Sequence, residues 1–195
     1  MIGIICAMDK ELKAFQESLV DSETLEIMGF KFYKGIINKH QVVLVKSGIG
    51  KVAAGIVTML LIEHFKPSLI INSGIAGGYS KKLNTLDLVV SKEAAYYDVD
   101  LTVDGAEYGK LSELPKYFEA DLEVTKLLDK NNINYYHGLI ITADTFANNR
   151  EKVSKGLNVL ICNPALVETG LNLLDFTTIV FYQLGYNLNT MRQAS

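Results

Sequence analysis

The sequence predicts an α/β protein in which helices cover both faces of a mixed or mostly parallel sheet. Two observations support this class. Short apolar, β-branched runs alternate with segments in which apolar residues recur at helical spacing. Chains that alternate strands and helices in this way bury both faces of their sheet. The chain has 195 residues, of which 49% are hydrophobic, so we expect one domain, residues 1–195, with a substantial core.

The first part of the chain gives two buried strands separated by a meander and two helices. Ile2–Cys6 is a short β-branched run typical of a buried strand, and residues 8–19 follow with an apolar helical stripe. Turn-forming residues separate the next runs, which favours antiparallel strands. These expected strands are 25–28, Phe30–Ile37 and 41–46. Lys51–Phe65 then predicts a helix that ends before Pro67, and residues 68–72 predict the second buried strand.

Two features of this part carry specific expectations. In the helix Lys51–Phe65, apolar residues at helical spacing predict the buried stripe. That expected stripe is Val52, Ile56, Met59 and Leu60. After the second buried strand, the glycine-rich segment 73–78 predicts a turn.

The second part repeats the alternation and contains one long polar segment, 98–118, that we expect to be a loop. The expected strands are 86–91, 94–97, 135–142, Val159–Cys162 and 177–182. The expected helices are 119–131, a short one at 151–156, and a leucine-rich one that ends near Leu174. Strands and helices therefore alternate to the end of the chain, which keeps the expectation of a covered sheet.

Charge and cysteine content argue against several classes of function. A net charge of −3 does not favour nucleic acid as a partner, because nucleic-acid binders carry basic surfaces. Cys6 and Cys162 are the only cysteines, and neither lies in a CxxC motif. The histidines are scattered, so we expect no metal site; we also expect no cofactor. No apolar run approaches the roughly 20 residues that cross a bilayer, and no signal-like pattern opens the chain. We therefore expect a cytoplasmic protein with no membrane partner.

The segment Ser47-Gly48-Ile49-Gly50-Lys51 joins an expected strand to an expected helix. Such a loop exposes backbone N–H groups at the positive end of a helix and can hold an anion. A dinucleotide site would need an acidic residue at the end of the next strand, where Asn72-Ser73 stands instead. A P-loop would need Ser or Thr at the position of Val52. A tight turn that allows close packing is the competing interpretation.

Two further segments follow buried strands. The run Asn72–Gly78 carries three glycines, which let a ligand approach the backbone closely; a purely structural turn rarely needs so many. Glu11 follows the first strand at the sheet edge where ligands of open α/β sheets bind. Its carboxylate is either a charge at a helix N-terminus or a catalytic base. The cluster of Tyr96, Tyr97, Asp98 and Asp100 is equally consistent with a sheet edge or an interface patch.

Together these residues resemble the 5'-methylthioadenosine/S-adenosylhomocysteine nucleosidases of the nucleoside phosphorylase superfamily. The resemblance rests on five segments and covers roughly residues 1–160. They are residues 2–8 with Glu11, 46–54, 72–78, Glu107-Tyr108-Gly109, and Asp144-Thr145-Phe146. The resemblance implies a three-layer α/β/α domain around a mixed sheet that curls toward a barrel. It also implies a homodimer.

The implied chemistry is hydrolysis of the N-ribosidic bond of methylthioadenosine or adenosylhomocysteine, which releases adenine and serves methionine salvage. The transition state resembles an oxocarbenium ion, as in other glycoside chemistry. Glu11 matches the glutamate that activates water. The positions that match substrate-binding residues are Ile49, Ala76, Gly77, Phe146, Ala147, Cys162 and Asn163.

The sequence departs from the family pattern at two functional positions. Asn163 stands where the family has the glutamate that holds the ribose hydroxyls. Tyr186 stands where the family has the aspartate that protonates the purine. A tyrosine has an ordinary pKa near 10, against about 4 for aspartate, so it is a weak proton donor at neutral pH. The sequence also ends at Ser195, before the position of the family's last helix, and we expect a domain without that helix.

These departures leave several alternatives open. The chain is a nucleosidase with reduced activity, or a relative that binds adenine nucleosides without turnover, or a product altered near its end by a reading-frame error. Local repacking that recruits Asp144 or Asp175 as the acid is a further alternative. A phosphate-dependent phosphorylase is less favoured, because it would need cationic residues converging on the loop that begins at Ser47.

Overall fold

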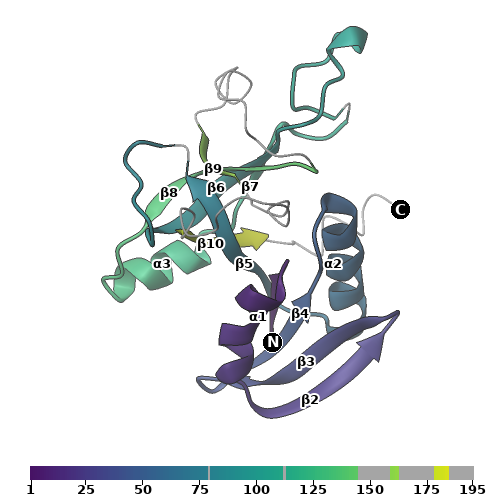
Figure 1. Ribbon diagram of the computed structural model, residues 1–195, viewed down its shortest axis with the longest axis vertical. Coiled ribbons are helices and arrows are strands. Elements are labelled where there is room, and N and C mark those ends of the chain that lie inside the picture. The colour runs from purple at the N-terminus through teal and green to yellow at the C-terminus, as the bar shows by residue number, and fades with distance from the viewer. Residues whose placement is uncertain (79, 112, 145–158, 163–177, 185–195) are drawn as a thin grey trace.

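The computed structural model describes residues 1–78, 80–111, 113–144, 159–162 and 178–184 (Figure 1). In these ranges the strands form one mixed sheet. At its centre β1 (Ile2–Cys6) lies parallel to both β4 (His40–Lys46) and β5 (Leu69–Gly78). Antiparallel β3 (Phe30–Ile37) and β2 (Val20–Ile27) extend the sheet beyond β4. The expected meander is therefore confirmed, and it forms one end of the sheet.

The other part of the sheet closes on itself. The strands involved are β5, β10 (Thr178–Leu184), β6 (Leu88–Tyr96), β8 (Tyr136–Thr142) and β9 (Val159–Cys162). Each pairs with the next in that order, and β9 pairs back with β5. The short strand β7 (Tyr117–Glu119) adds to β6. This ring confirms the expectation of a sheet that curls toward a barrel.

Two helices cover opposite faces of the central strands, as Figure 1 shows on either side of β4. Alternate residues of a strand point to opposite faces. Ile5 therefore packs with Val57 and Leu61 of α2 (Lys51–Phe65). Its neighbours Ile4 and Cys6 instead pack in a cluster with Leu12 of α1 (Asp9–Glu17). The continuous apolar runs of β1 and β4 follow from this, because both of their faces are buried.

The remaining described elements are short. Helix α3 (Glu123–Lys130) precedes β8, and a 3-10 turn spans Thr102–Asp104. This turn and most of β7 fall in the segment 98–118 that was expected to be a loop, and the helix expected over 119–131 begins only at Glu123. The expected helices at 151–156 and before Leu174 lie outside the described residues. Among the residues that the structure describes, no helix is long and apolar enough to cross a membrane.

Two expectations about local structure are wrong. The glycine-rich segment 73–78 is not a turn, because β5 continues to Gly78 and pairs with β10 and then with β9. The buried stripe of α2 is also different from the expected one. Val52, Ile56 and Met59 are exposed, whereas Val57 and Leu61 are fully buried. This helix is apolar on most of its surface, so apolar spacing alone could not identify the face that meets the sheet.

Candidate active site

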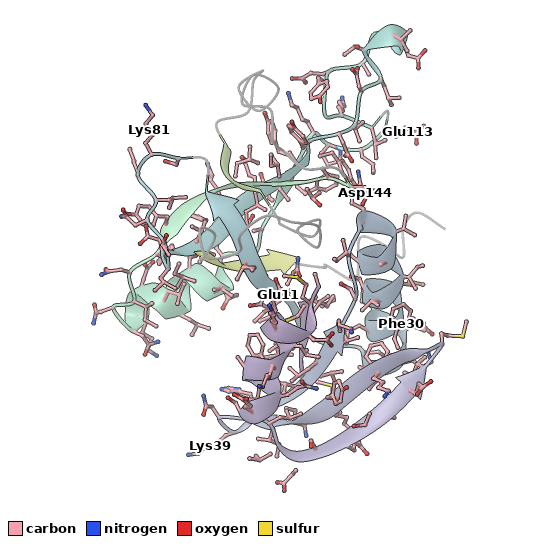
Figure 2. The ribbon with its side chains drawn as sticks, viewed as in Figure 1. Glu11, Phe30, Lys39, Lys81, Glu113 and Asp144 are labelled. Atoms are coloured by element: carbon pink, nitrogen blue, oxygen red, sulfur yellow. The ribbon has the colours of Figure 1, made fainter. Side chains whose placement is uncertain are left out.

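The carboxylate of Glu11 lies at the carboxyl edge of the central strands, where β4, β1 and β5 run side by side. Glu11 sits in the first turn of α1, and this helix begins directly after β1. Its Oε2 accepts hydrogen bonds from the N–H groups of Ala7 (3.0 Å) and Met8 (2.9 Å). Its Oε1 accepts one from the N–H of Ile75 on β5 (3.0 Å). Figure 2 shows Glu11 at the end of α1 near β5.

This arrangement pulls the pKa of Glu11 in two directions. Burial raises the pKa, because it removes water from the charged form. The three backbone N–H groups lower it, and the net result is a pKa above the ordinary value. Within the described residues no cation pairs with this carboxylate, and a carboxylate with a raised pKa is well suited to take a proton from water.

Gly74 supplies the space for this carboxylate. A Cβ atom added at Gly74 would lie 2.5 Å from Oε1 of Glu11 and 2.9 Å from its Cδ, closer than real atoms approach. Any larger residue at this position would displace the carboxylate and break its bond to Ile75. The glycine-rich segment was expected to bring a ligand close to the backbone. Here one of its glycines brings the glutamate close to the backbone.

The loop after β4 lies beside the loop after β1. The N–H of Ser47 donates to the carbonyl of Cys6 over 2.8 Å, and Ser47 is buried. Ile49, which follows in this loop, is half-buried. Cys6 is fully buried, and burial together with the neighbouring Glu11 charge raises the pKa of its thiol to about 12. Cys6 is therefore a protonated core residue and not a nucleophile.

The other positions expected to bind substrate are placed only in part. Ala76 is buried on β5 in a cluster with Val89 and Ile140, and Gly77 pairs with Cys162 of β9. The remaining predicted positions lie outside the described residues: Phe146, Ala147, Asn163 and Tyr186. In the described ranges, no group of three or more His, Cys, Asp or Glu side chains could hold a metal ion.

Sequence reasoning missed two parts of this edge. One is the role of Gly74, which the glycine motif contained but whose partner lies 63 residues earlier in the chain. The other is a charged cluster of Lys51, Asp98 and Asp144. The sequence places Lys51 in the loop motif and Asp98 in the aromatic cluster, but no sequence pattern joins the two. Asp144 had been considered as a replacement acid, but both of its carboxylate oxygens are engaged by Lys51.

The mixed sheet is covered by helices and partly closed into a ring, and the Glu11 carboxylate lies at the carboxyl edge of its strands. These features define a class of α/β proteins that bind ligands at the carboxyl ends of their strands. The family model described as Phosphorylase superfamily matches residues 1–191. The 5'-methylthioadenosine/S-adenosylhomocysteine nucleosidase of Exiguobacterium sp. is 42% identical over 158 residues, which cover 78% of this chain and 68% of that protein. The chain spans about two thirds of the length of the curated relatives that it matches.

Solved structures agree with these relatives. The nucleosidase of Colwellia psychrerythraea 34H, solved in complex with adenine, is 35% identical with a TM-score of 0.77; the match covers 92% of this chain and 79% of that one. The nucleosidase of Streptococcus pneumoniae, solved with the transition-state inhibitor MT-ImmA, is 31% identical with a TM-score of 0.76 and coverages of 92% and 83%. The chain therefore belongs to the phosphorylase superfamily and, within it, to the 5'-methylthioadenosine/S-adenosylhomocysteine nucleosidases.

Proposed function

We propose that this chain hydrolyses the N-ribosidic bond of 5'-methylthioadenosine and S-adenosylhomocysteine and releases adenine. The observation that carries the proposal is the Glu11 carboxylate, desolvated and held by three backbone N–H groups at the carboxyl edge of the sheet. In this proposal Glu11 removes a proton from water as the water attacks the anomeric carbon. The bond from that carbon to the purine breaks, and its electron pair leaves with adenine, which must gain a proton.

The other site residues are proposed from the family pattern. Ile49, Ala76 and Gly77 are proposed to line the sugar and purine, together with Phe146, Ala147, Cys162 and Asn163. The proton for adenine has no assigned donor, because Tyr186 stands at the position of the family's acid. Losing an acid catalyst typically costs about 10²–10⁴-fold in rate, so we expect slow turnover. Consumption of methylthioadenosine would place the enzyme in methionine salvage.

The test is product analysis. Purified protein is incubated with 5'-methylthioadenosine in water enriched in the heavy oxygen isotope, and the adenine and the sugar are identified by mass spectrometry. Hydrolysis predicts free adenine and one heavy oxygen on the anomeric carbon of the released sugar. No adenine above the level of Glu11→Gln protein would contradict the proposal. Glu17→Gln, at an exposed position of the same helix, is the matched control.

Binding without turnover is the second candidate, and the sequence at Asn163 and Tyr186 favours it. Asparagine lacks the charge that a carboxylate would offer to the ribose hydroxyls, and tyrosine is a weak acid at neutral pH. Calorimetry distinguishes this candidate: adenine and 5'-methylthioadenosine would both bind, and no adenine would be released from the nucleoside over hours.

The geometry of the loop that begins at Ser47 disfavours a phosphate-dependent reaction. A phosphorylase needs positive charge to hold phosphate. The two lysines that border this loop are both paired with carboxylates. Lys46 lies 2.9 Å from Asp9, and Lys51 lies 2.5 Å from Asp98. Added phosphate should therefore leave the rate of adenine release unchanged.

We also propose that the protein acts as a homodimer in the cytoplasm. The exposed side chains of Val52, Ile56 and Met59 form an apolar stripe on α2, which a second copy of the chain would cover. The free thiol of Cys6, buried in the core, is consistent with a reducing compartment.

A further inference from the structure

Three charged side chains at the carboxyl edge of the sheet form a group that we call the clasp: Lys51, Asp98 and Asp144. Lys51 is the first residue of α2, and it follows β4 through the loop 47–50. Asp98 comes two residues after the end of β6, and Asp144 comes two residues after the end of β8. Figure 2 shows Asp144 beside one end of α2.

The clasp residues are joined by four direct interactions. The Lys51 ammonium donates to Oδ1 of Asp98 over 2.5 Å and lies 3.7 Å from Oδ2 of Asp144. The backbone N–H of Lys51 donates to Oδ1 of Asp144 over 2.7 Å. The backbone N–H of Asp144 donates to Oδ2 of Asp98 over 2.8 Å. Each of the three residues therefore contacts both of the others.

The clasp connects the ends of strands that are not all neighbours in the sheet: β4, β6 and β8. In the sheet order, β9, β5 and β1 lie between β8 and β4. The Glu11 carboxylate is held by Ala7 and Met8, which follow β1, and by Ile75 of β5; both strands lie within this interval. The clasp therefore connects the two sides of the edge in which Glu11 lies. This connection is possible because the sheet closes into a ring beyond β5.

The surroundings favour a firm connection. The side chains of Lys51 and Asp98 are only 24% and 17% exposed, and the ammonium lies 5.2 Å from the centre of the Tyr96 ring. The carboxylate of Asp144 meets the first N–H of a helix, where the helix dipole favours negative charge. Gly50 has a φ of 103°, and a Cβ there would meet Oδ1 of Asp144 at 3.4 Å. The positive φ favours glycine at position 50, whereas the contact with Asp144 is an ordinary one.

We propose that the clasp is a positioning device, which sets the spacing between the loop 47–50 and the ends of β6 and β8 so that an adenine nucleoside fits between them. The inference rests on the proposed function. In this proposal Glu11 performs the chemistry, and Lys51, Asp98 and Asp144 act only by setting the spacing of the segments that carry them. Loss of the clasp should therefore weaken binding more than it slows the bound substrate.

The test compares Lys51→Met and Asp98→Asn with wild type. We measure KM and kcat for 5'-methylthioadenosine and Kd for adenine by calorimetry. We expect KM and Kd to rise about tenfold or more in each variant with kcat changed less, because a smaller fraction of the protein would hold the spacing that binds the nucleoside. The double variant should be no worse than either single one, because both remove the same ion pair. Lys51→Arg should recover most of the loss.

Lys46→Met is the matched control. Lys46 also pairs with an aspartate, Asp9, at this edge, but both of these side chains are more exposed than those of Lys51 and Asp98. The KM and Kd of the Lys46→Met protein should match those of wild type. Unchanged KM and Kd with a lower unfolding midpoint in Asp98→Asn would make the clasp merely structural and overturn the inference. A fall in kcat with a shifted pH profile and unchanged KM would also overturn it, because the clasp would then take part in the chemistry.

Failure of the proposed function gives a different result. If wild type binds adenine but releases none from the nucleoside, hydrolysis is contradicted, and the Kd values still decide the inference. If wild type binds no adenine, both are contradicted.

Discussion

Two carboxylates at the same sheet edge are held in opposite ways. Glu11 is held by backbone N–H groups, no cation of the described part of the chain pairs with it, and its burial leaves its pKa raised. Asp98 is also partly buried, which by itself would raise its pKa, but the Lys51 ammonium and the Asp144 N–H lower the pKa below the ordinary value. The first can therefore exchange a proton with substrate water, whereas the second stays charged and anchors structure.

The largest expected effect comes from removing the charge of Glu11. Glu11→Gln keeps the shape of the side chain but cannot accept a proton, so adenine release should fall by about 10²–10⁴-fold. Steady-state assays with 5'-methylthioadenosine measure this loss. The exposed Glu17→Gln on the same helix should keep the wild-type rate. Equal rates in wild type, Glu11→Gln and Glu17→Gln would remove the distinction drawn between Glu11 and Asp98.

The next effect is smaller and tests how Glu11 is held. Gly74→Ala places a Cβ where the Glu11 carboxylate lies, so it should displace the carboxylate and cost about 10²-fold in kcat, as expected for small misplacements. The assay is again adenine release. Gly55→Ala is the control, because a Cβ there meets nothing within 4 Å. A fully active Gly74→Ala enzyme would show that the observed position of Glu11 is not needed.

Asp98, the carboxylate paired with the Lys51 ammonium, should contribute more to the stability of the fold than Glu11 does. Because the pKa of Asp98 is lowered in the folded protein, its contribution is fully present above its ordinary pKa. That contribution is lost as the pH falls through the lowered value. Asp98→Asn should cost roughly 1.5–3 kcal/mol at pH near 7 and much less in acid, since hydrogen bonds to charged groups are worth about that much.

Urea unfolding of both proteins at neutral and acid pH measures this difference. The exposed Asp104→Asn, on the segment that follows β6, is the control and should change little. An effect of Asp98→Asn that is independent of pH would mean that the pairing with Lys51 does not stabilise the fold.

The smallest effect on chemistry is expected on the outer face of α2. Met59→Lys places a charge in the exposed apolar stripe, where Met59 is 62% exposed, and should weaken a homodimer while leaving each fold intact. Light scattering over a range of protein concentrations measures the oligomeric state. Ala14→Lys, at an exposed position of α1, is the control for added charge. A wild-type chain that is monomeric at all concentrations would contradict the proposed dimer.

Much of the fold could be predicted because the signals are local. The strand Ile2–Cys6, the helix Lys51–Phe65 and the position of Glu11 after the first strand all follow from short apolar runs and their ends. The strand β5 was cut short in the prediction, because glycines indicate turns. They remain in this strand because β10 and β9 supply its hydrogen-bond partners from more than 80 residues later.

The contacts of the site could be predicted only where one segment of the chain supplies both of the residues that interact. The contacts of Glu11 with Ala7 and Met8 are local, whereas its contacts with Gly74 and Ile75 depend on how β1 pairs with β5. The clasp depends on the ring closure, which brings together residues far apart in the chain. The roles of Asn163 and Tyr186, outside the described residues, remain predictions.

The pH dependence of kcat/KM for adenine release tests the central account most directly, because it reports the ionisation of groups in the free enzyme. We predict an acidic limb set by one group that must lose a proton, with a pKa above the ordinary glutamate value, as burial of Glu11 requires. The small residual rate of Glu11→Gln should lack that limb. An acidic limb at or below the ordinary value, or one that persists unchanged in Glu11→Gln, would contradict the account.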